Sequence, residues 1–187
     1  MAGKLYLCAT PIGNLEDITY RVVRTLNEVD LIGAEDTRNS IKLLNHFDIK
    51  TPLTSYHEYN KVDKAYQLVE KMQQGTNIAL ITDAGTPGIS DPGEDLVRIC
   101  YEQGIEVTSL PGAAACITAL TLSGLPTRRF SFEAFLPKEK KERAAVLEEL
   151  KNDTRTLIVY EAPHHLLGTL KELQNALGDR RLTVCRE

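Results

Sequence analysis

Short apolar runs alternate with amphipathic stretches along most of the sequence, and this alternation constrains the fold more than any other feature. Residues 5–9 are apolar on both faces, as expected of a strand buried between two layers. Asp17 is predicted to cap the next stretch, residues 18–29, which places Val22 and Leu26 on one helical stripe. Repetition of this pattern predicts an α/β fold, with a parallel sheet and helices on both of its faces. Further strands are predicted at 31–34, 78–82 and 105–110, and further helices at 40–47, 62–74, 94–103 and 113–122.

The pattern changes around the segment SGLPTRR, residues 123–129, where Gly124 and Pro126 interrupt a helix. We therefore predict an N-terminal α/β domain over residues 1–123 and the start of a C-terminal α/β domain over residues 124–187. The second domain has few strands for a closed core, so we expect it to be incomplete and to continue beyond this sequence. Its predicted elements are strands 130–135, 156–161 and 182–186 and helices 138–151 and 164–177.

Composition excludes several classes of protein. The 187 residues carry a net charge of −4 and a pI of about 5.6, so nucleic-acid binding would need a local basic patch. No stretch is long and apolar enough for a signal peptide or a membrane span, which predicts no membrane association. The four cysteines are scattered without a CxxC pair and are expected to be reduced thiols of a cytoplasmic protein: Cys8, Cys100, Cys116 and Cys185.

Three loops of small residues each follow a predicted strand. They are ATPIGN (residues 9–14), DAGTPGISDPG (83–93) and PGAAA (111–115). Loops that follow parallel strands lie together at the carboxyl edge of the sheet, where ligands bind. Each loop alone is compatible with a tight turn, but three together, each richer in Gly and Pro than a turn requires, favour a cleft that recognises a ligand through its main chain.

The motifs also restrict the ligand. No GxGxxG follows the first strand and no Walker lysine is present, which disfavours NAD and ATP. Asp36, Asp83 and Asp91 could be imagined as a metal site, but their spacing matches no known ligand pattern, so no metal is predicted.

Six motifs, in order along essentially the whole chain, resemble those of the bacterial methyltransferases of small-subunit ribosomal RNA, within the tetrapyrrole methylase superfamily: LYLCATPIGNLEDIT, AEDTR, SYHEYN, ITDAGTPGISDPG, LPGAAA and YEAPHHL. The resemblance implies 2′-O-methylation, with S-adenosylmethionine, of one cytidine ribose in the decoding region of 16S rRNA within the small ribosomal subunit. It also implies a homodimer of two-domain chains, longer than this one, with the cofactor between the domains.

The resemblance assigns cofactor-binding positions residue by residue. Many relatives have Gly-Asp-Pro where this chain has Gly85-Thr86-Pro87, so the group that meets the cofactor's ammonium or ribose is left open. The expected cofactor-binding residues are Pro11, Asp83, Thr86, Pro87, Ile89, Ser90, Ala114, Ala115, Tyr160, Glu161 and Ala162.

A ribose hydroxyl must lose its proton as it attacks, so a general base is expected. The candidate catalytic residues are His57, Glu58, Asp36 and Arg38. The last two follow the strand predicted at 31–34, and the first two are expected near the same edge of the sheet. A structural alternative stays open for the last two: Asp36 or Thr37 caps the following helix and Arg38 pairs with an acid. His164 and His165 are expected to cap and pack a helix.

An acidic protein that binds ribosomal RNA must concentrate its positive charge where it contacts the RNA. The candidate RNA-binding residues are Arg128, Arg129, Lys138, Lys140, Lys141 and Arg143. Two other readings remain open: a methyltransferase of the same superfamily that acts on a tetrapyrrole or on a modified protein histidine, and a non-catalytic domain that binds a small molecule or builds an interface.

Overall fold

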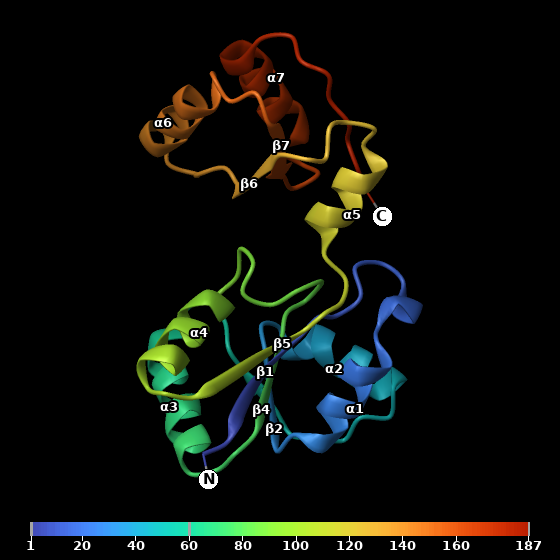
Figure 1. The fold of residues 1–187 in the computed structure, drawn as a ribbon, viewed down its shortest axis with the longest axis vertical. Coiled ribbons are helices and arrows are strands. Elements are labelled where there is room, and N and C mark those ends of the chain that lie inside the picture. The colour runs from blue at the N-terminus through green and yellow to red at the C-terminus, as the bar shows by residue number, and fades with distance from the viewer. Residues whose placement is uncertain (1, 60, 187) are drawn as a thin grey trace. The chain divides into compact units, whose positions relative to one another are not determined.

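A computed structural model describes residues 2–59 and 61–186, which divide into two compact units, Met1–Ala115 and Cys116–Glu187. The first unit is built on a five-stranded parallel sheet in the order β3-β2-β4-β1-β5 (Figure 1). The predicted α/β class is therefore confirmed. The strands are β1 (Lys4–Cys8), β2 (Leu31–Ala34), β3 (Leu53–Ser55), β4 (Ile78–Ile81) and β5 (Glu106–Leu110).

The strand order determines which face each helix covers. From β1 to β3 the chain moves in one direction across the sheet, and from β3 to β5 it moves back. Because crossovers are right-handed, the helices of the two legs must pack on opposite faces. Accordingly α1 and α2 lie on one side of the sheet and α3 and α4 on the other (Figure 1). These helices are α1 (Tyr20–Glu28), α2 (Thr37–His46), α3 (Lys61–Gln73) and α4 (Gly93–Glu102).

Two apolar cores lie on opposite faces of the sheet, one under each pair of helices. In β4, Ile78 and Leu80 belong to the cluster under α3 and α4, whereas Ala79 and Ile81 belong to the cluster under α1 and α2. Successive strand residues point to opposite faces, so a run that is apolar throughout supplies both cores.

Two local predictions in this unit are corrected. Asp17 does not cap α1: it ends a short 3₁₀ helix, Leu15–Asp17, and the Thr19 hydroxyl instead accepts a hydrogen bond from the amide of Val22 at 3.1 Å. The three-residue strand β3 was not predicted, because Leu53–Ser55 is too short and too polar to show a period.

The second unit contains the parallel strand pair β6 (Phe130–Phe135) and β7 (Thr156–Tyr160), with α5 (Ala115–Leu122), α6 (Lys140–Leu150) and α7 (Leu166–Leu177). The predicted strand at 182–186 is wrong, because these residues form neither helix nor strand. The Thr183 hydroxyl donates to the Ser123 carbonyl at 3.0 Å, so a side-chain contact, rather than a ladder, holds the segment.

The division of the structure groups all of α5 after Ala115 with the second unit, whereas the sequence predicted the boundary after Ser123. That domain assignment stays a prediction. Within the described ranges, no helix combines the length and apolarity that a membrane span requires.

Candidate functional site

The three small-residue loops of the first unit are joined by hydrogen bonds at the carboxyl edge of the sheet. Thr10, after β1, and Gly85, after β4, form an antiparallel bridge through N–H to carbonyl contacts of 2.9 and 3.0 Å. The Thr86 hydroxyl donates to the carbonyl of Ala113, after β5, at 2.9 Å. The prediction that the loops meet at one edge is thus confirmed.

Two glycines of these loops are favoured for different reasons, a positive φ at Gly85 and a close approach at Gly112. Gly85 has φ of +89°, and a Cβ there would lie 3.4 Å from Ile12 Cγ2 and 3.6 Å from the Ala113 carbonyl. A Cβ on Gly112 would lie only 2.6 Å from the Ala9 Cβ. A Cβ on Gly112 would push the loops apart, whereas the distances at Gly85 are ordinary contacts and its positive φ is what favours glycine there.

Asp91 explains more of the long loop after β4. Its carboxylate accepts hydrogen bonds from the amide of Gly88 at 2.9 and 3.0 Å and from that of Gly93 at 2.7 Å. This arrangement folds the loop on itself and presents Ile89, 48% exposed, and Ser90 at its tip. Asp91 therefore has a structural task in addition to any contact with a ligand.

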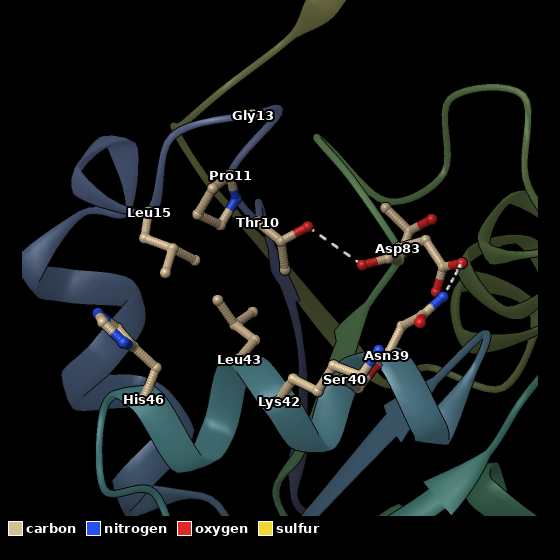
Figure 2. A pocket seen from close by; sticks show the side chains of 11 residues that line it. Thr10, Pro11, Gly13, Leu15, Asn39, Ser40, Lys42, Leu43, His46 and Asp83 are labelled. Carbon is tan, nitrogen blue, oxygen red and sulfur yellow. Dashed lines mark hydrogen bonds between the residues drawn. The ribbon is translucent and has the colours of Figure 1, made fainter. Parts of the chain in front are cut away.

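A cavity of about 340 Å³ opens beside these loops, on the α1–α2 side of the sheet. Its position follows from the topology. The chain leaves β4 toward α4 on the other face, while the chains leaving β1 and β2 turn toward α1 and α2, so space remains between them. The lining residues are Thr10, Pro11, Gly13, Leu15, Asn39, Ser40, Lys42, Leu43, His46, Thr82 and Asp83 (Figure 2).

The floor of the cavity is polar and largely hydrogen-bonded. The Thr10 hydroxyl donates to the Thr82 carbonyl at 3.1 Å, and the Thr82 hydroxyl donates to Glu35 at 2.8 Å. The Asn39 amide donates to the Asp83 carboxylate at 3.1 Å, which Figure 2 shows at the end of the cavity nearest the loop after β4.

Ser40 differs from its neighbours. Ser40 belongs to the lining of the cavity and is 4% exposed, and its hydroxyl, itself shielded from solvent, has no hydrogen-bond partner in the described structure. A buried polar group without a partner costs free energy, and such groups in folded proteins call for an explanation. The sequence analysis missed Ser40 and Asn39, because within α2 they look like ordinary polar positions of an amphipathic helix.

The candidate catalytic residues fall into separate groups. Asp36 is the N-cap of α2 and accepts from the backbone and the guanidinium of Arg38, with a shortest contact of 2.7 Å. The structural alternative for this pair is therefore confirmed. These hydrogen bonds lower the pKa of Asp36 to about 2, which makes its carboxylate a weak base.

The other two candidates follow β3, at the edge of the sheet. Glu58 pairs with Lys61 at 2.8 Å, and Lys61 also contacts Asp95 at 2.9 Å. His57 packs edge-on against Tyr59, with ring centroids 6.1 Å apart. Neither His57 nor Glu58 belongs to the lining of the cavity.

The cofactor candidates are also spread over the structure. Pro11 and Asp83 line the cavity. Thr86, Pro87, Ile89, Ser90, Ala114 and Ala115 lie on the loops after β4 and β5 or at the start of α5. In the second unit Tyr160 ends β7, and Glu161 and Ala162 follow it; the Ala162 amide donates to the Glu161 carboxylate at 2.7 Å.

Tyr160 is held among aromatic rings and stays neutral. Its ring packs edge-on against Phe132 and Phe135 at centroid distances of 5.1 and 5.6 Å. Burial, followed by the nearby Cys116, raises the pKa of Tyr160 to about 12, so the phenol keeps its proton at neutral pH.

One candidate RNA-binding residue, Arg143, is bonded to other side chains of the second unit. Arg143 is 18% exposed and donates to Glu172 at 2.6 Å and to the Thr169 hydroxyl at 2.9 Å, with Glu161 at 4.0 Å. The sequence analysis did not foresee this network. By contrast Arg128, Arg129, Lys138, Lys140 and Lys141 are exposed.

His164 and His165 lie before α7, and His165 stands at its N-cap position without a side-chain cap bond. The capping predicted for it is thus wrong, because its side chain does not accept from the first turn. In residues 2–59 and 61–186, no three His, Cys, Asp or Glu side chains are placed to hold a metal ion.

Comparison with known proteins gives concordant matches. Residues 4–187 match the family described as Tetrapyrrole (Corrin/Porphyrin) Methylases. The chain is 55% identical over 185 residues to ribosomal RNA small subunit methyltransferase I of Halalkalibacterium halodurans, covering 99% of this chain and 64% of that protein. It is 57% identical over 186 residues to the protein of the same name from Synechocystis sp., covering 99% and 67%. The chain thus spans about two thirds of the length of these relatives.

A solved structure shares the fold at low identity. Uroporphyrin-III C-methyl transferase from Thermus thermophilus, complexed with S-adenyl homocysteine, superposes with a TM-score of 0.66. The superposition covers 93% of this chain and 77% of that chain at 19% identity.

Proposed function

Because the chain belongs to the tetrapyrrole methylase family, we propose that the whole protein is an S-adenosylmethionine-dependent methyltransferase of ribosomal RNA. We propose further that it methylates the 2′-hydroxyl of one cytidine in the decoding region of 16S rRNA, acting on the small ribosomal subunit as a cytoplasmic homodimer. The names of the relatives support the class of substrate, and the six sequence motifs support the finer assignment. The observation that carries the proposal is the joining of three small-residue loops at one sheet edge.

The residues at this edge fit S-adenosylmethionine. The molecule has no phosphate, so it needs none of the phosphate-binding motifs that the chain lacks. Small residues of the loops after β4 and β5, such as Ala84 and Ala115, are exposed and carry little side-chain bulk to hinder an approach to the main chain. We assign binding to Pro11, the segment from Asp83 to Ser90, and Ala114 and Ala115, with Tyr160, Glu161 and Ala162 from the second unit. When bound, the cofactor supplies a methyl group on a sulfonium.

The tasks left to the chain are alignment and proton removal. Holding an acceptor oxygen in line with the methyl group supplies much of the rate of such a displacement. Asp36 is poorly suited to take the proton because of its low basicity, and we propose that it and Arg38 fix the start of α2 instead. His57 and Glu58 stay our candidates for assisting proton removal, tested by alanine variants that keep cofactor affinity and lose single-turnover rate.

Labelled S-adenosylmethionine with undermethylated small subunits tests the function of the full-length protein. We expect label in the ribose of a 16S rRNA cytidine. Label in RNA at a base would overturn the 2′-O assignment, and label only in a tetrapyrrole or a protein histidine would move the protein elsewhere in its family. No label in any acceptor would favour a binding or interface role.

A triple variant tests the RNA contacts. Lys138, Lys140 and Lys141 are exposed, so replacing all three with Gln should weaken subunit binding and flatten its salt dependence. Removing one lysine–phosphate interaction lowers the slope of log K against log salt by roughly 0.7–0.9. Arg143 is left unchanged because of its internal partners. An unaltered slope would direct the search to Arg128 and Arg129.

A further inference from the structure

The cavity beside α2 has a lining that the cofactor proposal does not account for. Only Pro11 and Asp83 are shared with the cofactor positions; Ser40, Lys42, Leu43 and His46 of α2 have no assigned task. Its volume of about 340 Å³ lies at the lower end of the range for small-molecule sites, which suits one nucleoside rather than an extended ligand.

Apolar residues of the lining lie on two sides of the cavity. Pro11 and Leu15 face Leu43 across the opening (Figure 2), so apolar surface is available on two sides of a flat ring. Bases extruded from RNA are commonly held between apolar or aromatic side chains and recognised along their polar edges.

Polar residues for such an edge belong to the same lining. The Ser40 hydroxyl is buried and has no partner in the described structure, although it can both donate and accept. Asn39 next to it offers an amide whose nitrogen contacts Asp83 at 3.1 Å. A ligand that hydrogen-bonds to Ser40 would satisfy a group that the folded chain leaves unsatisfied.

Cationic groups stand at the exposed side of α2. Lys42 is exposed and lines the cavity, as does His46 at the last turn of the helix. The carboxylate of the lining, Asp83, already accepts from Asn39, and a lysine at the mouth of the pocket is suited to the phosphate that adjoins a nucleoside.

We propose that this cavity binds one pyrimidine nucleotide of the RNA substrate, with the base between Pro11, Leu15 and Leu43, its edge at Ser40 and Asn39, and its phosphate at Lys42. The inference rests on the proposed function, since it names the part of the RNA that the site holds. It places the acceptor beside Asp83 and Pro11, which are shared with the cofactor positions.

The test uses cytidine 5′-monophosphate and cytidine as probes, titrated into ¹⁵N-labelled full-length protein, with S-adenosylhomocysteine in a separate titration. We expect cytidine 5′-monophosphate to shift the amides of residues 10–15 and 39–46. S-adenosylhomocysteine should shift chiefly those of residues 83–90 and 111–115. Because this readout needs no methyl transfer, it remains valid if the catalytic assignment fails.

Variants then separate the contacts. Ser40→Ala should weaken the binding of both cytidine 5′-monophosphate and cytidine about threefold to tenfold, which is the effect of one hydrogen bond. Lys42→Gln should weaken cytidine 5′-monophosphate by a similar factor and leave cytidine unchanged. Lys71→Gln on the opposite face of the sheet is the charge-matched control and should change neither. Leu43→Phe should fill the cavity and reduce binding of both.

Three outcomes would overturn the proposal. In the first, S-adenosylhomocysteine rather than cytidine 5′-monophosphate shifts the amides of residues 39–46. In the second, neither cytidine 5′-monophosphate nor cytidine shifts the amides of residues 10–15 or 39–46. In the third, the wild-type protein and a folded Ser40→Ala variant bind the probes with equal affinity. An equal loss of both probes in Lys42→Gln would contradict the phosphate assignment.

Discussion

The sheet edge of the first unit and the polar network of the second both gather partly buried hydroxyl and charged groups, but they do so in opposite ways. In the second unit Arg143, Thr169, Glu161 and Glu172 bond to one another. At the edge of the first unit, the buried Ser40 hydroxyl has no partner in the described structure, and Ser40 belongs to the lining of a cavity. A satisfied polar cluster stabilises the fold, whereas an unsatisfied hydroxyl in a residue that lines a cavity is one basis of our nucleotide proposal.

The largest effect is expected from Arg143→Met. The change removes donors to Thr169 and Glu172 and leaves the half-buried Glu161 without its nearby cation, which should lower the stability of the second unit by about 2–3 kcal/mol. Denaturant unfolding with hydrogen exchange in α6 and α7 measures it. Lys141→Met, exposed on the same helix, is the control and should change stability by less than about 0.5 kcal/mol. Equal stability of the two variants would show that the Arg143 network does not stabilise the second unit.

Gly85→Ala should act on both stability and ligand binding. A left-handed φ disfavours any residue with a Cβ by roughly 1–2 kcal/mol. Gly104 also has a positive φ, of +69°, but no heavy atom lies within 4 Å of a Cβ placed there. Gly104→Ala thus imposes a comparable backbone strain at a position outside the three loops. Calorimetry should show weaker S-adenosylmethionine binding for Gly85→Ala alone; a matching loss in both variants would mean that strain, rather than the site, is responsible.

Acid should weaken the second unit through Glu161. Burial raises the pKa of Glu161, but the Thr169 hydroxyl, the Ala162 amide and the Arg143 charge outweigh it, so the pKa lies below that of an ordinary glutamate. A carboxyl with a lowered pKa contributes stability that is present above its unfolded pKa and is lost as the pH falls through its folded pKa. Unfolding midpoints measured from about pH 6 to about pH 3 should therefore fall, and Glu161→Gln should reduce the slope. A slope that Glu161→Gln leaves unchanged would assign the acid sensitivity to other groups.

The smallest effect is expected from Ser40→Ala, and it contrasts two buried hydroxyls. Removing a hydroxyl that has no partner in the described structure should change stability by less than about 0.5 kcal/mol or raise it slightly. Thr169→Val, of equal shape, deletes the hydroxyl that donates to Glu161 at 2.5 Å and accepts from Arg143, and should cost about 1–3 kcal/mol. Thermal unfolding of both variants decides whether the two hydroxyls differ as described.

Much of the fold was predictable because local pattern and tertiary packing agree. The strand over Ile78–Ile81 is apolar on both faces, and the helices over Lys61–Gln73 and Gly93–Glu102 carry one apolar stripe each. Failures occurred where local signals were ambiguous. Asp17 and Thr19 can both cap a helix, and residues 182–186 have the composition of a strand but form no ladder with another strand in the described structure.

The site was less predictable than the fold. The meeting of the three loops followed from their positions after parallel strands. The cavity did not, because it arises from the strand order, which sends the chain after β4 to the opposite face from its neighbours. The internal partners of Arg143 were also hidden, since Thr169 and Glu172 are 26 and 29 residues away in the sequence.

The most direct test of the contrast between the two regions is a crystal structure of the full-length protein with S-adenosylhomocysteine. We expect ligand density against the loops after β1, β4 and β5, at Pro11, Asp83 and Ala114, with the Arg143 network intact and the space beside Ser40 still open to a nucleotide. Density that fills the cavity around Ser40, or that displaces Arg143 from Glu172 and Thr169, would contradict it.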